Sequence, residues 1–142
     1  MQKQLADQVA VVTAAGRGIG KGIALSLAAA GAQVVINSYS EATTAQTLAE
    51  VKALGVPAIA LPGDITEPEQ MLALRELALA EFGQIDILVN NVGAGPKSMP
   101  AAQAHELGGA AMLWDALYQQ NLLPVVLMTE AVIPHMRERR SG

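Results

Sequence analysis

The chain has 142 residues, which is enough for about one domain. Nine Lys and Arg residues against 13 Asp and Glu residues give a net charge of −4, and this argues against a nucleic-acid partner, which usually needs concentrated positive charge. The absence of cysteine excludes disulfides, thiolate metal sites and a thiol nucleophile.

Short β-branched runs alternate along the chain with longer Ala- and Leu-rich stretches. Each run is bounded by Gly, Pro, Asn or Asp, which is typical of a fully buried strand. The runs that predict strands are residues 9–13, 34–37, 58–61 and 85–90. The alternation predicts an α/β fold with a parallel sheet and helices on both of its faces. Such sheets bind ligands at the carboxyl ends of their strands.

Three stretches between these strands have apolar residues at helical spacing. Their predicted buried faces are Ile19, Ile23, Leu27 and Ala30; Ala45, Leu48, Val51 and the stem of Lys52; and Met71, Leu74, Leu77 and Ala78. Thr66 and Glu69 have the spacing of a capping box, which predicts that Thr66 caps the third helix.

A last long helix is predicted over residues 109–140. Pro124 within it has no N–H, so the carbonyl of Gln120 loses its helical partner. We therefore expect a kink that frees backbone acceptors beside Asn121.

A Gly-rich turn follows the first strand and leads into the first helix. Its residues are Thr13, Ala14, Ala15, Gly16, Arg17, Gly18, Ile19 and Gly20. Glycines let backbone approach a phosphate closely, and the helix N-terminus supplies N–H donors. The turn predicts a phosphate or pyrophosphate site, although an ordinary Gly-containing turn without ligand is the alternative. Its spacing departs from the usual G-x-G-x-x-G of dinucleotide sites.

This turn resembles the Thr-Gly-x-x-x-Gly-Ile-Gly cofactor turn of the short-chain dehydrogenase/reductase family, with Ala14 in place of the first Gly. Further matches are Asp64-Ile65, Asn90-Asn91-Val92-Gly93 (similar to Asn-Asn-Ala-Gly), and Asn121 followed by Pro134-x-Met136. The resemblance covers essentially the whole chain. It implies a Rossmann-type, doubly wound sheet of about four strands in the order 3-2-1-4, with residues 1–142 as an NAD(P)-binding domain.

The resemblance also implies roles for residues at the predicted ligand edge. Asp64 would accept from the adenine amino group and Ile65 would supply its backbone N–H, although Asp64 could instead cap the next helix. Asn91, with Val92 and Gly93, would contact the cofactor, while Asn90 would be more structural.

The charges at the end of the second strand favour one nucleotide over the other. NAD sites place an acid at the end of the second strand, but this chain has Ser38 and Tyr39 there, with no acid before Glu41. Arg17 lies where related NADP enzymes keep a basic residue against the 2′-phosphate, although it could be a solvated arginine that balances the pyrophosphate. We therefore predict NADP as cofactor in preference to NAD.

Asn121 is the one catalytic candidate. In the resembling family the corresponding Asn is the fourth member of the catalytic set and holds a water in a proton relay. The alternative is a kink with a buried polar side chain. His105 and His135 lack a metal-ligand pattern, so we predict no metal site and packing or surface roles for both. Residues 95–109 could shape a substrate entrance or form a solvated insertion.

The family's catalytic Tyr, followed four residues later by Lys, has no counterpart here. Neither Tyr39 nor Tyr118 has Lys at that distance. We therefore interpret the chain as the N-terminal, cofactor-binding part of a longer reductase, inactive alone. The parent would transfer hydride between NADP(H) and a small-molecule carbonyl or alcohol, with a 3-oxoacyl thioester as one candidate, and would form a homodimer or homotetramer. A non-catalytic nucleotide-binding module and a subunit-interaction piece are the alternatives.

The N-terminal residues are polar and lack the apolar run of a signal peptide. Apolar stretches such as residues 23–32 are shorter than the ~20 residues that a membrane helix needs. A cytoplasmic protein without a membrane partner is therefore predicted.

Overall fold

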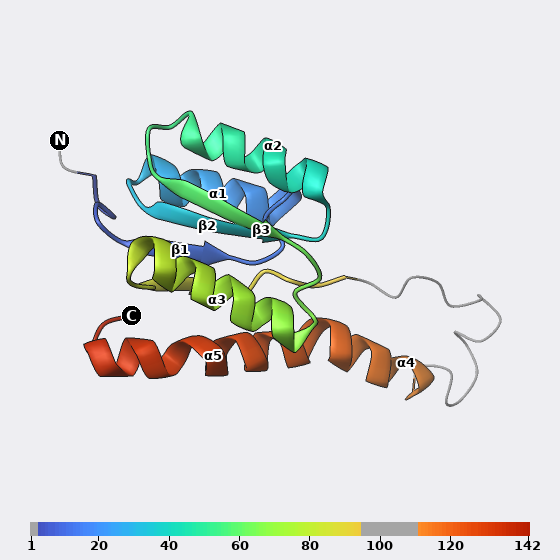
Figure 1. Cartoon of the computed structure of the whole chain (residues 1–142). Helices are drawn as coiled ribbons and strands as arrows, with labels where there is room; N and C mark the ends of the chain where they lie inside the picture. Colours follow the sequence, from blue (N-terminus) through green and yellow to red (C-terminus); the bar gives the residue numbers. More distant parts are fainter. Residues whose placement is uncertain (1–2, 95–110) are drawn as a thin grey trace.

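The computed structural model describes residues 3–94 and 111–142 (Figure 1). Strands and helices alternate along the chain. Their bounds are β1 Val9–Val12, α1 Gly18–Ala29, β2 Gln33–Ser38, α2 Glu41–Lys52, β3 Ala58–Pro62, α3 Pro68–Phe82, β4 Ile87–Val89, α4 Ala111–Leu117, the π-helical turn η1 Tyr118–Leu122, and α5 Leu123–Arg139.

The four strands form one parallel sheet in the order β3-β2-β1-β4. Val11, in the central strand β1, is paired with Val35 of β2 and Leu88 of β4. Helices α1 and α2 cover one face of the sheet, and α3 and α5 cover the other (Figure 1). The predicted α/β architecture and the strand order 3-2-1-4 are therefore confirmed.

Side chains of a strand point alternately to the two faces of the sheet and so enter two separate cores. Val9 and Val11 lie in the core beneath α3 and α5, with Met128 and Val132 of α5. Val12 lies in the core beneath α1 and α2. All of these side chains are fully buried, as expected of a sheet that is covered on both faces.

Strand β4 is shorter than the predicted residues 85–90. Its pairing with β1 ends at Val89. The backbone N–H of Asn91 then donates to the side-chain oxygen of Thr13 at 3.0 Å. The chain has thus already entered the loop at the ligand edge.

The predicted buried faces of two helices need correction. In α1 the buried residues are Gly20, Ala24 and Ala28, whereas Ile19 is 78% exposed. Small residues let this helix approach the sheet closely, and Ile23 and Leu27 pack half-buried at its sides. The buried face of α1 therefore differs from the predicted one.

In α2 the buried residues are Thr44, Thr47 and Val51, and Ala45 is exposed. Only Val51 of the fully buried set was predicted. Helix α3 buries Met71, Leu74 and Ala78, as predicted, with Leu77 half-buried at the margin; these four are the residues named for its face.

The predicted capping box at the start of α3 is wrong. Glu67 occupies the N-cap position and Pro68 the first turn, with no side-chain cap. The hydroxyl of Thr66 instead donates to Asp64 Oδ1 at 2.7 Å, and the Thr66 N–H donates to the same oxygen at 2.9 Å. Asp64 therefore organises the loop before the helix.

The last helix is not continuous. The π-helical turn η1 separates α4 from α5, and the N–H of Leu123 donates to the carbonyl of Tyr118, five residues earlier. A π turn shifts the hydrogen-bond pattern by one residue, and this accommodates Pro124 in the first turn of α5. The predicted start at residues 109–110 lies outside the described part of the chain.

The end of the sheet opposite the ligand edge is held by a polar cluster. Asp86 Oδ2 accepts from the N–H of Val9 at 2.8 Å, and Asp86 Oδ1 pairs with Arg139 of α5 at 2.9 Å. His135 Nε2 accepts from the N–H of Ile85 at 3.2 Å. His135 thus has the packing role predicted for it, while His105 lies outside the described residues.

Within residues 3–94 and 111–142, the helices are too short or too polar to cross a bilayer.

Candidate functional site

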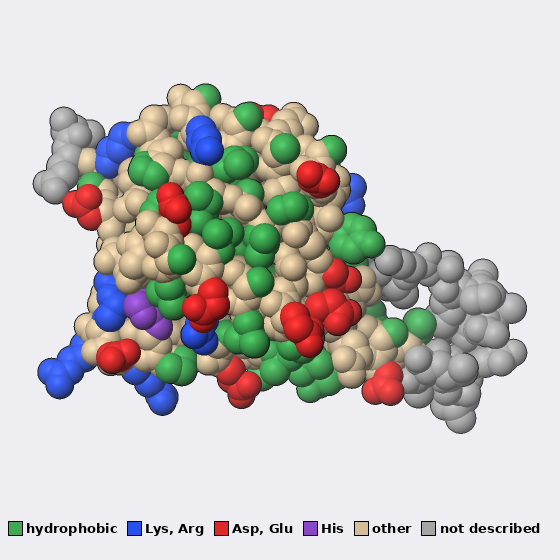
Figure 2. All heavy atoms as spheres, in the orientation of Figure 1, with side chains coloured by type: hydrophobic (Ala, Val, Ile, Leu, Met, Phe, Trp, Pro, Cys, Tyr) green, Lys and Arg blue, Asp and Glu red, His purple; other side chains and the backbone are tan. Residues whose placement is uncertain are grey.

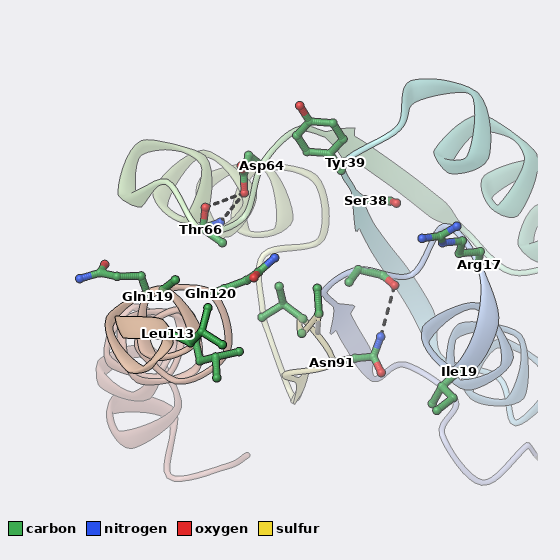
Figure 3. A pocket seen from close by; sticks show the side chains of 16 residues that line it. Arg17, Ile19, Ser38, Tyr39, Asp64, Thr66, Asn91, Leu113, Gln119 and Gln120 are labelled. Atoms are coloured by element: carbon green, nitrogen blue, oxygen red, sulfur yellow. Dashed lines mark hydrogen bonds between the residues drawn. The ribbon is translucent and has the colours of Figure 1, made fainter. Parts of the chain in front are cut away.

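A pocket of about 930 Å³ opens at the carboxyl ends of the strands (Figure 3). All four strand ends contribute to it, and α4 and η1 close the far side. Its lining residues are Ala14, Arg17, Ile19, Ser38, Tyr39, Asp64, Thr66, Asn91, Val92, Gly93, Ala94, Leu113, Ala116, Leu117, Gln119 and Gln120. The pocket thus lies at the edge where the parallel-sheet rule locates ligands.

The turn between β1 and α1 has its carbonyl groups tied to neighbouring side chains. The Asn91 amide donates to the Ala14 carbonyl at 3.2 Å, and the Thr47 hydroxyl donates to the Gly16 carbonyl at 3.1 Å. Helix α1 begins at Gly18, and the first N–H groups of a helix have no partner within it. The turn can therefore offer N–H donors and positive helix potential to an anion.

Two glycines of the turn are needed because of close packing. A Cβ atom at Gly20 would collide with the Asn91 amide and the Ala14 carbonyl. A Cβ atom at Gly16 would collide with the side-chain hydroxyls of Ser38 and Thr43. These two glycines are therefore required by packing within the protein, and the phosphate cradle stays a prediction.

Two other positions of the turn have left-handed backbone. Gly18 has φ +55° and open space around it, so its conformation alone favours glycine. Ala14 has φ +52°, which costs a non-glycine residue about 1–2 kcal/mol. The position where the resembling family has glycine is thus strained by alanine here.

Thr13 lies beneath the pocket and is fully buried. Its hydroxyl oxygen accepts from the N–H groups of Asn91 at 3.0 Å and Val92 at 3.2 Å, and the hydroxyl donates to the Val89 carbonyl at 3.2 Å. Thr13 thus holds the loop after β4 against the end of β1. Ala15, also in the predicted set, is buried in the core beneath α1 and α2.

Asn37, near the end of β2, was missed by the sequence analysis. Its side-chain amide donates to the carbonyls of Leu61 and Gly63, both at 3.1 Å, and Asn37 Oδ1 accepts from the N–H of Ala14 at 3.5 Å. It is 1% exposed and joins the ends of β1, β2 and β3. A polar residue at the end of an otherwise apolar strand was the available signal.

Arg17, Ser38 and Tyr39 gather on one side of the pocket (Figure 3). Ser38 is 9% exposed, whereas Tyr39 is 79% exposed. Among the described residues that line the pocket, Arg17 is the one cation and Asp64 the one carboxylate. The end of β2 therefore presents hydroxyl groups and a neighbouring guanidinium to a ligand.

Asp64 lies across the pocket from Arg17 (Figure 3). The two Thr66 donors described above both bind Oδ1. Asp64 therefore organises the loop before α3 and does not cap that helix, because Glu67 holds the N-cap position; Asp64 also lines the pocket. Ile65 is 4% exposed and its side chain packs in the core beneath α3 and α5.

Asn121, on η1, clamps the loop after β4. Its Oδ1 accepts from the N–H of Ala94 at 2.9 Å, and its amide donates to the carbonyls of Ala94 at 3.1 Å and Leu117 at 3.0 Å. Its side-chain oxygen also lies 3.0 Å from where a Cβ of Gly93 would be. Asn121 therefore fixes the pocket wall, and its relay role stays a prediction.

Gln119 and Gln120 also line the pocket and were not predicted. Gln120 is directed into the pocket, whereas Gln119 is directed away from it (Figure 3). They belong to the π-helical turn, and such turns are frequent at functional sites. Pro124 was the signal in the sequence, but the type of turn could not be derived from it.

An ion pair joins helix α1 to helix α2. Lys21 of α1 contacts Glu50 of α2 at 2.8 Å. The hydrogen bond from Lys21 lowers the pKa of Glu50 below its usual value, assisted by Gln46. In the part of the chain that the structure describes, no group of three His, Cys, Asp or Glu residues has a metal-binding arrangement.

The model of the short chain dehydrogenase family matches residues 8–142. The chain is 33% identical to the 7alpha-hydroxysteroid dehydrogenase of Escherichia coli K12 over 142 residues, which cover 98% of the chain and 52% of that protein. It is 39% identical to a 3-oxoacyl-[acyl-carrier-protein] reductase of Synechocystis over 140 residues, which cover 97% and 54%. The chain thus spans about half the length of these curated relatives.

A metagenomic short-chain oxidoreductase solved in complex with NADP has a similar structure. The TM-score is 0.83 at 34% identity, covering 98% of the chain and 61% of that structure. A hydroxysteroid dehydrogenase from Escherichia coli gives a TM-score of 0.80 at 33% identity, covering 97% and 53%.

Proposed function

Because the chain belongs to the short-chain dehydrogenase/reductase family, we propose that it binds NADP(H) for hydride transfer between the nicotinamide and a small-molecule carbonyl or alcohol. The observation that carries the proposal is the pocket at the strand ends, bordered by the glycine turn on one side and by Asn91–Gly93 on another. The relatives are named for different substrates: one is a hydroxysteroid dehydrogenase and another is a 3-oxoacyl-[acyl-carrier-protein] reductase. We therefore limit the substrate to the carbonyl and alcohol class.

The cofactor's phosphates would lie against the turn at Gly18–Gly20, where the N–H groups of α1 begin. Asp64 and the backbone of Ile65 would hold the adenine, and Asn91 with Gly93 would hold the ribose next to the nicotinamide. The nicotinamide supplies the hydride chemistry when the cofactor is bound. The protein supplies binding and orientation, because each of these loops is tied to a neighbouring strand end.

NADP is proposed in preference to NAD because of the charges around the end of β2. Arg17 offers a guanidinium to the 2′-phosphate, and Ser38 offers a hydroxyl. NAD sites have an acid at the end of the second strand that binds the ribose hydroxyls, and this chain has Ser38 and Tyr39 there. The NADP complex of the similar metagenomic structure agrees with this choice.

The Arg17→Ala substitution should remove the preference for the phosphorylated nucleotide. We expect NADPH affinity to fall about tenfold or more, since a charge-assisted hydrogen bond contributes about 1.5–3 kcal/mol. NADH affinity should change little. Fluorescence titration with both nucleotides measures the two dissociation constants. A variant with an unchanged ratio of NADH to NADPH dissociation constants would show that Arg17 does not bind the 2′-phosphate.

The chemical step is assigned to the whole protein. Neither Tyr39 nor Tyr118 is followed by Lys at the fourth position, so these described tyrosines do not match the family's acid. We propose that residues 1–142 bind cofactor without turnover. Titration with NADPH should show binding, while NADPH oxidation with a panel of ketones should stay at the background rate. Turnover by these residues alone would contradict this assignment.

Asn121 is proposed to support a proton relay in the whole protein. Its side chain is engaged with Ala94 and Leu117, so a water would bind to a backbone carbonyl of the π turn. The side chain would then act by holding that turn in place.

Self-association is a second proposed property, favoured by an exposed apolar stripe along α4, η1 and α5. Figure 2 shows hydrophobic side chains along this part of the molecule. The stripe consists of Trp114, Tyr118, Leu122, Val126 and Ile133. Contiguous exposed apolar surface is typical of protein interaction sites. A homodimer or homotetramer that packs these helices together would cover it.

The Val126→Glu substitution should dissociate this assembly, because it would bury a carboxylate between apolar helices. Multi-angle light scattering should give a dimer or tetramer mass for the parent chain and a monomer mass for the variant. Leu72→Glu is the matched control, because Leu72 is 50% exposed on α3, outside the stripe. A monomeric parent chain would contradict the proposal.

A further inference from the structure

Helix α2 buries two threonines where a helix against a sheet usually buries apolar residues. Thr44 is 1% exposed and Thr47 is 0% exposed. Threonine is a poor helix former, and a buried hydroxyl destabilises the fold unless it is hydrogen-bonded. Valine has nearly the same shape without the hydroxyl. The hydroxyl groups therefore need an explanation in their partners.

Both threonines donate to backbone at the ligand edge. The Thr44 hydroxyl donates to the carbonyl of Ser40 at 2.7 Å and also lies 3.4 Å from the carbonyl of Ser38. This contact fixes the first turn of α2 to the end of β2. Thr47 follows three residues later on the same face of the helix. Its hydroxyl donates to the carbonyl of Gly16 at 3.1 Å, between segments 31 residues apart.

The bond to Gly16 determines the orientation of the next residue. The carbonyl of Gly16 and the N–H of Arg17 belong to one planar trans peptide and point in opposite directions. Because Thr47 holds the carbonyl toward α2, the Arg17 N–H points away from α2. The backbone from which the Arg17 side chain leaves toward the pocket is thereby fixed (Figure 3).

Gly16 is packed closely on the side where a Cβ atom would lie, and its carbonyl is held by the bond from Thr47. The side-chain oxygens of Ser38 and Thr43 occupy the space that a Cβ of Gly16 would need. With the hydroxyl of Thr47 removed, the Gly16 carbonyl would remain buried without its donor. Such a group gains by turning toward water, and this rotation would move Arg17.

We propose that Thr47 is a positioning residue that sets the preference for the 2′-phosphorylated nucleotide. Thr47 does not line the pocket, so it acts through the peptide that joins Gly16 to Arg17. This inference rests on the proposed NADP(H) function and adds a specificity determinant to it.

The test is the pair of variants Thr47→Val and Thr47→Ser, each titrated with NADPH and with NADH. Valine keeps the shape and removes the donor. NADPH affinity should therefore fall about tenfold, which is the size of effect expected from the loss of one hydrogen bond. NADH affinity should fall only about twofold, because NADH has no phosphate for Arg17 to bind. Serine keeps the donor and should restore the preference.

Thr129→Val is the matched control. Thr129 on α5 accepts a hydrogen bond from the Asn90 amide at 3.1 Å, away from the turn. Its replacement removes one hydrogen bond of similar kind and should leave the ratio of NADH to NADPH dissociation constants unchanged. This control separates a general loss of stability from a change in specificity.

The outcomes distinguish the inference from the proposed function. If Thr47→Val keeps the parent's preference, or loses affinity for both nucleotides equally, the positioning role of Thr47 is refuted while NADP binding stands. If the parent protein itself does not prefer NADPH to NADH, the proposed NADP preference is refuted and the role of Thr47 falls with it. Loss of preference in the valine variant with recovery in the serine variant supports the inference.

Discussion

Replacement of Gly20 by alanine should reduce NADPH affinity by at least about 100-fold, since a displacement of about 1 Å in a binding element has effects of this size. The added Cβ atom would collide with the Ala14 carbonyl and the Asn91 amide. Neither can yield locally, because each is bonded to the other across the turn at 3.2 Å. The first turn of α1 must therefore move away from the proposed phosphate position. Isothermal titration with NADPH measures the loss.

Gly22→Ala is the matched control for this prediction. Gly22 lies one turn away from the ligand edge in the same helix, and a Cβ atom there would meet no neighbouring atom within 4 Å. Alanine in a helix interior stabilises it by about 0.5–1 kcal/mol relative to glycine. Gly22→Ala should therefore bind NADPH normally and unfold at a slightly higher temperature. If Gly20→Ala behaves in the same way, the turn does not approach the phosphates as closely as proposed.

The Asp86→Ala substitution should lower the free energy of unfolding by about 3 kcal/mol, because it leaves the N–H of Val9 without its acceptor and the partly buried Arg139 without its charged partner. The carboxylate is 9% exposed and accepts from the N–H of Val9, from Gln84 at 2.8 Å and from Arg139. It joins β1, the approach to β4 and the end of α5. In urea denaturation the midpoint should fall by about 1–2 M.

Two further variants test the cause of this loss. Asp86→Asn keeps an oxygen for the Val9 N–H and removes the charge, so its loss of stability should be about half as large. Glu76→Ala removes a carboxylate that is 64% exposed and pairs with the adjacent Arg75, so its effect should stay within about 0.5 kcal/mol. An Asp86→Ala effect as small as that of Glu76→Ala would mean that the cluster contributes nothing to stability.

The architecture and the ligand edge were predictable because their signals are local in the sequence. Each buried strand is a short β-branched run, and Gly16 to Gly20 follow the first of them directly. Alternation of strands and helices then requires parallel pairing and brings the strand ends together. The positions of Arg17, Ser38 and Asp64 on the pocket follow from this topology.

The helix faces were less predictable because hydrophobic periodicity favours large residues. Helix α1 packs on the sheet through Gly20, Ala24 and Ala28, and the larger Ile19 is displaced to the surface. The same bias concealed Thr47, whose burial depends on an acceptor 31 residues away. Close helix–sheet distance and tertiary hydrogen bonds are not encoded in the local pattern.

The polar residues that organise the loops were misassigned for a similar reason. Asn37 was passed over in favour of Ser38, although Asn37 joins three strand ends through its side chain. Thr66 was assigned a helix cap, but Asp64 competes successfully for its hydrogen bonds. Several short-range partners are available to such residues, and the choice among them is made by the folded backbone.

The strand order also has a consequence in time. Strand β1 is central, yet its two neighbours arrive very differently: β2 begins 24 residues after β1, and β4 begins 78 residues after it. The β1–β2–β3 unit can therefore form early. Strand β4 can pair with the other edge of β1 only after the long segment between them has brought the two strands together. The contacts of the Asp86 cluster would then form late in folding. Its removal should mainly hasten unfolding and leave the refolding rate nearly unchanged, a division that a chevron plot would reveal.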